Sequence, residues 1–220
     1  MVQFSLLAAG LLAPAVLAAP TPEPVAANSL EARFDGNGFN SWSEGGSNIK
    51  CVNGPGGSFT ANWNSKGGFV CGKGWNGQGA RTIKYSGTYN ATGPGYLAIY
   101  GWTRNPLIEY YIVDSHADLA PNEPWTSKGE FTSDEGTYEI FTSTRVNQPS
   151  IEGTRTFQQY WSVRKEKRVG GTVTTTKHFD EWAKQGMKLG TYDSVIVAVE
   201  GYTAANGGSG SSGSASITIE

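Results

Sequence analysis

Histidine, cysteine and charged side chains are all scarce in this chain. Its 220 residues include two histidines and two cysteines, and only 16% of the residues are charged. Neither His116 nor His178 has a second ligand at the spacing of a zinc site, and the serine nucleophile motif G-x-S-x-G does not occur. The sequence therefore argues against zinc-dependent hydrolysis and against a serine nucleophile, and we expect no metal and no organic cofactor.

Charge of either sign is too thinly spread to form a polyanion-binding surface. The chain has 17 basic and 19 acidic residues, which gives a formal charge of −2 at pH 7. We expect no nucleic-acid interface and no binding to an anionic membrane. The one basic cluster, formed by Arg164, Lys165, Lys167 and Arg168, is interpreted as a solvated turn.

Long apolar runs are missing after the N-terminal segment. Residues 1–19 are apolar, are too short to cross a bilayer and end in small residues, which is typical of a cleavable signal peptide. Residues 20–33 contain prolines and no hydrophobic periodicity, which predicts a propeptide or disordered leader. We therefore expect a secreted, extracellular protein in which residues 34–220 form a single domain.

Short runs of alternating apolar and polar residues are abundant from residue 38 onward. Each run is bounded by glycine, proline or asparagine and predicts a β-strand, and their regular spacing predicts two packed antiparallel sheets. Helical periodicity is confined to residues 178–187, where Phe179, Trp182, Ala183 and Met187 share one face. We predict one short helix packed outside a sheet. The glycine- and serine-rich run at 207–216 is interpreted as a loop before the last strand.

Aromatic and hydroxyl side chains are frequent, with seven Trp and ten Tyr in the chain. The flat faces of Trp and Tyr stack on the apolar face of a sugar, and hydroxyl groups bind its polar rim. The same residue types are also typical of an ordinary all-β core. Composition alone supports the two interpretations equally.

Export would permit two covalent modifications, a disulfide and N-glycosylation. Cys51 and Cys71 could form one disulfide, but the sequence cannot show whether their Cα atoms are close enough. The pairing therefore stays open. The segment Asn90-Ala91-Thr92 is an acceptor sequence for N-glycosylation, which would place it in a surface loop.

Two glutamates lie within strongly apolar strand sequences. Glu109 is inside PLIEYYIV, and Glu200 follows five apolar residues in SVIVAVEGY. A buried carboxylate is unfavourable unless it is paired or functional, so the two are candidates for one catalytic site. The alternative is a structural ion pair with Arg145 or Arg104. The remaining acidic residues, Asp114 among them, are predicted to be solvated.

Five motifs resemble those of one enzyme family in the same order. They are VNGPGGSF, YGWTRNPLIEYYIVD, RVNQPSIEGT, FQQYWSVR and VAVEGY. Together they resemble the family 11 glycoside hydrolases, the β-jelly-roll xylanases, and the resemblance extends from about residue 38 to the end. It implies an all-β jelly-roll sandwich of two antiparallel sheets, with a cleft on the concave sheet and a mobile thumb loop over the cleft.

The resemblance also implies a role for each candidate site residue. Glu109 would be the nucleophile and Glu200 the general acid/base of an endo-1,4-β-xylanase that cleaves xylan with retention of configuration. We expect xylan to be the partner and the protein to be a monomer. The resemblance places substrate-binding groups at Trp42, Tyr100, Tyr111, Arg145, Gln159 and Tyr202, and the thumb tip at Pro149, Ser150 and Ile151.

The chain departs from the family pattern at two positions. Gly68 stands where an Asn or Asp usually contacts the acid/base, so no side chain can reach Glu200 from there. Ser194 stands where a Tyr often occurs, which predicts weaker or different outer sugar-binding sites. We expect activity to survive, because both glutamates and the thumb sequence are present.

Two other functions fit parts of the sequence. A non-catalytic carbohydrate-binding jelly roll would share the aromatic residues and strands but would not need two facing glutamates. A β-glucan endohydrolase of the family 12 type would share the two carboxylates and would cleave cellulose or mixed-linkage glucan. The thumb sequence argues against this second alternative.

Overall fold

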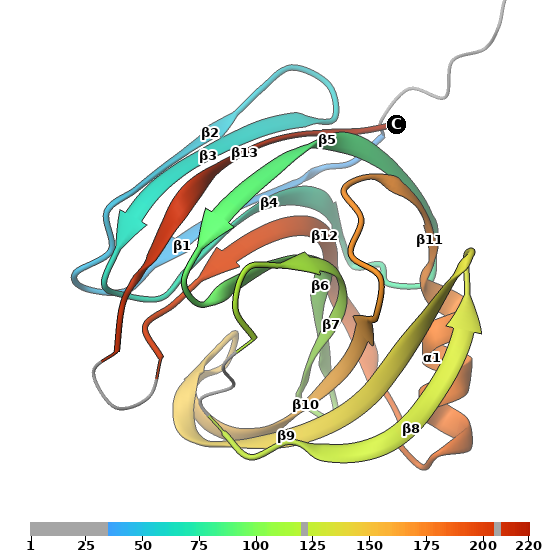
Figure 1. Cartoon of the computed structure of the whole chain (residues 1–220). Helices are drawn as coiled ribbons and strands as arrows, with labels where there is room; N and C mark the ends of the chain where they lie inside the picture. Colours follow the sequence, from blue (N-terminus) through green and yellow to red (C-terminus); the bar gives the residue numbers. More distant parts are fainter. Residues whose placement is uncertain (1–34, 120–122, 205–207) are drawn as a thin grey trace, which may run out of the picture. The chain divides into compact units, whose positions relative to one another are not determined.

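Two β-sheets and one helix form the folded part of the chain (Figure 1). A computed structural model describes residues 35–119, 123–204 and 208–220. The predicted signal peptide at 1–19 and leader at 20–33 lie outside the described residues. Within the described ranges, no helix has both the length and the apolar character needed to cross a membrane.

The larger sheet has eight strands and the smaller sheet has five, so the predicted all-β sandwich with one short helix is confirmed. Paired strands are antiparallel, except that β7 and β10 run parallel. In spatial order the larger sheet contains β1 (Gly38–Ser43), β4 (Phe69–Asn76), β12 (Thr191–Gly201), β6 (Gly95–Arg104), β7 (Ile108–His116), β10 (Gly153–Arg164), β9 (Gly136–Ser150) and β8 (Thr126–Ser133). The smaller sheet contains β11 (Gly171–Thr174), β5 (Thr82–Thr92), β13 (Ser211–Ile219), β3 (Ser58–Ser65) and β2 (Ile49–Asn53).

The central strands of the larger sheet are buried on both faces. On β12, Val197 and Val199 pack in the main core between the sheets, whereas Ile196 and Ala198 belong to a second apolar cluster on the opposite face. Strands β6 and β7 alternate in the same way. Burial on both faces explains the continuous apolar runs in the sequence. It also places Glu200 on the face that points away from the main core.

A disulfide connects the two sheets. Cys51 on β2 and Cys71 on β4 are bonded, with Cα atoms 5.8 Å apart. The sequence left this pairing open. Cys71 is fully buried and belongs to the main core, so the bridge crosses the sandwich instead of joining neighbours within one sheet.

The helix α1 (Thr175–Lys184) begins three residues earlier than predicted. The hydroxyl of Thr175 accepts a hydrogen bond from the Arg81 backbone N–H at 2.7 Å and donates one to the Gly79 carbonyl at 2.7 Å. The helix buries Phe179 and Trp182 as expected, but Ala183 is exposed and His178 is buried in its place. The predicted apolar face was therefore partly wrong.

Two predictions of solvated charges were also wrong. Asp114 is only 1% exposed and accepts hydrogen bonds from Tyr85 at 2.7 Å, Tyr138 at 2.8 Å and Arg168 at 3.0 Å. Arg164 is 7% exposed and donates to backbone carbonyl groups of the β8–β9 turn. Since Tyr85 lies on β5, its hydrogen bond to Asp114 joins the two sheets. Lys165 and Lys167 are exposed as predicted, so the prediction of a solvated turn is wrong for Arg164 and Arg168 and not for the two lysines.

Candidate active site

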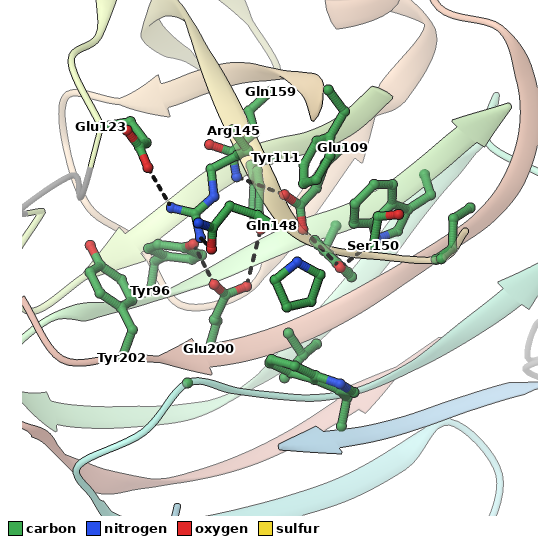
Figure 2. A pocket seen from close by; sticks show the side chains of 18 of the residues that line it. Tyr96, Glu109, Tyr111, Glu123, Arg145, Gln148, Ser150, Gln159, Glu200 and Tyr202 are labelled. Atoms are coloured by element: carbon green, nitrogen blue, oxygen red, sulfur yellow. Dashed lines mark hydrogen bonds and ion pairs between the residues drawn. The ribbon is translucent and has the colours of Figure 1, made fainter. Parts of the chain in front are cut away.

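Both candidate glutamates lie in one cleft, on the face of the larger sheet that points away from the main core (Figure 2). The cleft has a volume of about 380 Å³, within the usual range for sites that bind small molecules. Strands β1, β4, β6, β7, β9, β10 and β12 all contribute side chains to it. Every predicted site residue lines this cleft, including the thumb-tip residues Pro149, Ser150 and Ile151.

Glu109 is held by neutral hydrogen-bond donors. Gln159 Nε2 donates to Oε2 at 2.6 Å, and the Tyr100 hydroxyl donates to Oε1 at 3.1 Å. Ser143 donates to Gln159 Oε1 at 2.9 Å, which turns the amide so that its NH₂ group faces Glu109. The indole N–H of Trp102 donates to the Tyr100 oxygen, which leaves the Tyr100 proton for Glu109. A second layer of polar groups thus fixes both contacts of the carboxylate.

Glu200 is held by two tyrosines from the neighbouring strands. Tyr96 lies directly opposite Glu200 in the pairing of β6 with β12, and its hydroxyl donates to Oε1 at 2.8 Å. The Tyr111 hydroxyl donates to Oε2 at 3.3 Å. Tyr111 also lowers the pKa of Glu109, so this one residue acts on both carboxylates. Figure 2 shows the two acids facing the same part of the cleft.

The surroundings favour different protonation states for the two acids. Burial raises the pKa of Glu200, and the charge of Glu109 raises it further, to about 8. Burial also raises the pKa of Glu109, but hydrogen bonds from Gln159, Tyr111 and Tyr100 and the charge of Arg145 oppose that rise. At neutral pH this arrangement favours a proton on Glu200 and a negative charge on Glu109.

Arg145 is the cationic side chain of this cleft, but it does not form a salt bridge with either catalytic candidate. It pairs with Glu123 at 3.3 Å and donates to Gln148 Oε1 at 3.2 Å. Arg104, the other arginine considered from the sequence, binds Glu152 at 3.0 Å and Asp193 at 2.8 Å. The two cleft glutamates are therefore not members of a structural ion-pair network with Arg104.

The aromatic residues of the cleft divide into two groups. Trp42 is 44% exposed and offers an accessible ring face, as predicted for a sugar platform. Tyr100 and Tyr111 are 7% and 2% exposed, and their hydroxyl groups contact the glutamates. Tyr202 is partly exposed and packs near Tyr96, with ring centroids 5.9 Å apart.

Several cleft residues were not predicted from the sequence. Tyr96 lies on the same face of β6 as Tyr100 and Trp102, and this period of two could have revealed it. Trp161 stacks on Tyr111 with ring centroids 4.0 Å apart, and Trp125 packs on Trp161 at 4.8 Å. No local pattern marks Trp125 or Glu123, because the segment before β8 reaches the cleft only through the tertiary fold.

Gly68 also lines the cleft, and a carboxylate occupies the space beside it. The backbone N–H of Gly68 donates to Glu44 Oε1. A Cβ atom at position 68 would lie 2.9 Å from that oxygen, so any side chain there would have to displace Glu44. The departure from the family pattern at residue 68 thus coincides with a glutamate at the same edge of the cleft.

Comparisons with known proteins agree with one another. The sequence model described as "Glycosyl hydrolases family 11" matches residues 35–218. The chain is 49% identical over 225 residues to endo-1,4-beta-xylanase I of Cochliobolus carbonum, covering 100% of this chain and 99% of that protein. It is 52% identical over 182 residues to ethylene-inducing xylanase 1 of Verticillium dahliae, covering 82% and 78% of the two proteins.

A solved structure is similar over nearly its whole length. It comes from a structural comparison of two major endo-1,4-beta-xylanases from Trichoderma reesei. It superimposes with a TM-score of 0.76 at 40% sequence identity, covering 84% of this chain and 98% of that chain.

Proposed function

Because the chain belongs to glycosyl hydrolase family 11, we propose that it is a secreted endo-1,4-β-xylanase that cleaves internal bonds of xylan with retention of configuration. The observation that carries this proposal is the pair of carboxylates that line one cleft, where the charge of Glu109 raises the pKa of Glu200. The named xylanase relatives supply the substrate class. The roles of the two acids follow from their surroundings.

In the first step, ionised Glu109 attacks the anomeric carbon while Glu200 gives its proton to the departing glycosidic oxygen. The bond from that carbon to the leaving oxygen breaks, and a covalent ester with Glu109 forms. Retaining enzymes place the two carboxyl groups about 5–5.5 Å apart. At about 5.5 Å and an effective dielectric constant near 20, two carboxylates repel by roughly 3 kcal/mol, or about two pKa units. This repulsion helps to keep the proton on Glu200.

In the second step, Glu200 changes role. Once Glu109 is an ester it has lost its charge, so the pKa of Glu200 falls and the carboxylate can take a proton from water. The resulting hydroxide attacks the anomeric carbon from the face that the leaving group occupied, and Glu109 departs as a carboxylate. Two inversions restore the original β configuration, and Glu200 is protonated again for the next cycle.

Recognition of xylan would come from the exposed ring of Trp42 and from the thumb tip. The thumb is the end of the β9–β10 hairpin, and Pro149, Ser150 and Ile151 line the cleft from there. Xylose lacks the hydroxymethyl arm of glucose, so a narrow gap between thumb and sheet would discriminate by shape. A β-glucan endohydrolase would instead cleave cellulose or mixed-linkage glucan faster than xylan.

The experiment compares wild type with Glu109→Gln, Glu200→Gln and the control Glu139→Gln, which changes an exposed residue of β9. Reducing sugar released from xylan is measured, and the anomeric configuration of the first product is read by NMR. We expect both cleft variants to lose several orders of magnitude in kcat, with the fold intact by circular dichroism, and the control to match wild type. A non-catalytic sugar-binding protein would release no reducing sugar in any variant.

Export, processing and oligomeric state belong to the same proposal. Residues 1–19 would be removed as a signal peptide and residues 20–33 as a leader, leaving residues 34–220 as a monomeric catalytic domain. The mass and N-terminal sequence of protein collected from the medium test the processing, and light scattering tests the monomer. A dimer, or a mature chain that still contains residues 1–19, would contradict this part.

A further inference from the structure

The one N-glycosylation sequence in the chain, Asn90-Ala91-Thr92, lies far from the cleft in the fold. It belongs to strand β5 and not to the surface loop expected from the sequence. Tyr89 and Ala91 pack against the main core, so the alternation of the strand turns Asn90 and Thr92 outward. Both outward side chains are exposed.

The surroundings of Asn90 leave room for a large substituent. On one side, β13 places Ser214 opposite Asn90 and Ser212 opposite Thr92, and the Thr92 and Ser212 hydroxyls lie 2.9 Å apart. On the other side, β11 pairs with β5 only along residues 82–85, so no described strand covers β5 at Asn90. Small hydroxyl groups and an unpaired strand edge therefore surround the Asn90 amide.

The outer face of the smaller sheet is the side of the sandwich opposite the cleft. The smaller sheet is layered against the larger sheet (Figure 1), and its inner face forms the main core with it. The cleft opens on the far face of the larger sheet. A group attached to Asn90 would point into solvent and away from both glutamates.

We propose that Asn90 is a site of N-linked glycosylation and carries its oligosaccharide on the outer face of the smaller sheet. The donor is an oligosaccharide linked through its anomeric carbon to a lipid pyrophosphate. The Asn90 side-chain nitrogen forms a bond to that carbon, the bond from the carbon to pyrophosphate oxygen breaks, the lipid pyrophosphate leaves, and the amide loses one proton. In the native cell this step rests on the proposed export, because the transfer takes place in the secretory pathway.

The test is secretion of the full chain from a yeast host behind a leader peptide of that host, so that export does not depend on residues 1–19. The intact mass of the secreted protein is measured before and after digestion with peptide N-glycosidase. We expect the mass of one oligosaccharide to disappear on digestion and Asn90 to become Asp in the peptide map. The mass is read without substrate, so the result stands apart from the xylanase proposal.

Three variants assign the site. Asn90→Gln and Thr92→Ala both destroy the acceptor sequence and should remove the oligosaccharide, whereas Thr92→Ser keeps the acceptor sequence and should retain it. Because the site is remote from the cleft, kcat/KM on xylan should be equal before and after digestion. Secreted wild type with the bare polypeptide mass, or an oligosaccharide that persists in Asn90→Gln, would overturn the proposal. A change in kcat/KM on digestion would overturn the remote placement.

Discussion

At the scale of single residues, the two glutamates differ in what surrounds them. Both line the cleft, where Glu109 is buried and Glu200 is partly exposed. Glu109 has Gln159 and Tyr100 as donors, whereas the charge of Glu109 raises the pKa of Glu200. The sequence could reveal both glutamates, because each interrupts an apolar strand. The sequence placed Gln159 and Tyr100 in the cleft as substrate-binding groups but not as donors to Glu109, since Gln159 meets Glu109 through the pairing of strands that are distant in the chain.

Removing one donor from Glu109 should shift the acidic limb of the pH profile. In Tyr100→Phe the ionised form of Glu109 loses a hydrogen bond, so the pKa of Glu109 rises. The acidic limb of kcat/KM should therefore move to higher pH by about one pH unit. The measurement is kcat/KM on soluble xylan against pH. Tyr160→Phe is the control, because the Tyr160 hydroxyl contacts the Lys188 carbonyl and not the cleft acids. Coincident acidic limbs in Tyr100→Phe and wild type would rule out this role.

Glu123 should influence the pKa of Glu200 through Arg145. Among the largest influences on the pKa of Glu200, Arg145 is the one that lowers it by charge. Glu123→Gln removes the negative partner of Arg145, so the pKa of Glu200 should fall and the alkaline limb should move to lower pH, on the order of half a unit.

The matched control for that change is Glu130→Gln, which breaks an exposed pair with Lys165 outside the cleft. Its alkaline limb should coincide with that of wild type. An unmoved alkaline limb in Glu123→Gln, or an equal shift in both variants, would show that Glu123 does not tune the cleft.

At the scale of elements, periodicity predicts strands well and helix faces less well. Alternation along β3 and β13 is repeated over several residues, so their existence follows from the sequence. The helix is short, and its face is decided by what packs on it. His178 is buried because Phe131 on β8 and Tyr138 on β9 cover it, with ring centroids 4.9 Å and 4.7 Å away. Such a partner from a distant strand leaves no local signal.

His178 should make the folded state sensitive to acid. Among the described residues neither ring nitrogen has a hydrogen-bond partner, and burial lowers the pKa of His178 to about 3. As the pH falls from about 6.5 towards 3, the unfolded chain binds a proton that the folded chain does not. The free energy of unfolding therefore decreases by about 1.4 kcal/mol for each pH unit that the pH falls within this range.

The check is urea unfolding of wild type and His178→Phe between pH 7 and pH 4. The difference in unfolding free energy should change steadily in favour of the variant as the pH falls through this window. Other titrating groups are common to both proteins and cancel in the difference. Parallel stability curves would contradict the prediction, whatever their offset at pH 7.

At the scale of the whole sandwich, covalent and polar links join the two sheets. The Cys51–Cys71 bridge closes a sequence separation of 20, and Asp114 bonds Tyr85 across the core. Neither link could be fixed from the sequence, because each depends on which strands face one another. Apolar patterning indicated two sheets, whereas their packing decided which polar groups meet between them.

Removing the bridge should lower stability without changing the cleft. Because the bridge closes a loop of this size, we expect the double variant Cys51→Ala/Cys71→Ala to have a free energy of unfolding about 2–4 kcal/mol lower than wild type. Denaturant unfolding with and without reductant measures the loss, and kcat/KM at low temperature should remain that of wild type. Equal unfolding midpoints for the oxidised wild type and the double variant would contradict a stabilising bridge.

The most direct test of the two-acid mechanism is to trap its covalent intermediate. A xylobioside with fluorine at C2 and a good leaving group should react once with wild type and deacylate slowly. We predict one added disaccharide per protein molecule, located by peptide mass spectrometry on Glu109, and rapid loss of activity on xylan. A label on Glu200, or no label together with a first product of α configuration, would contradict the proposed roles.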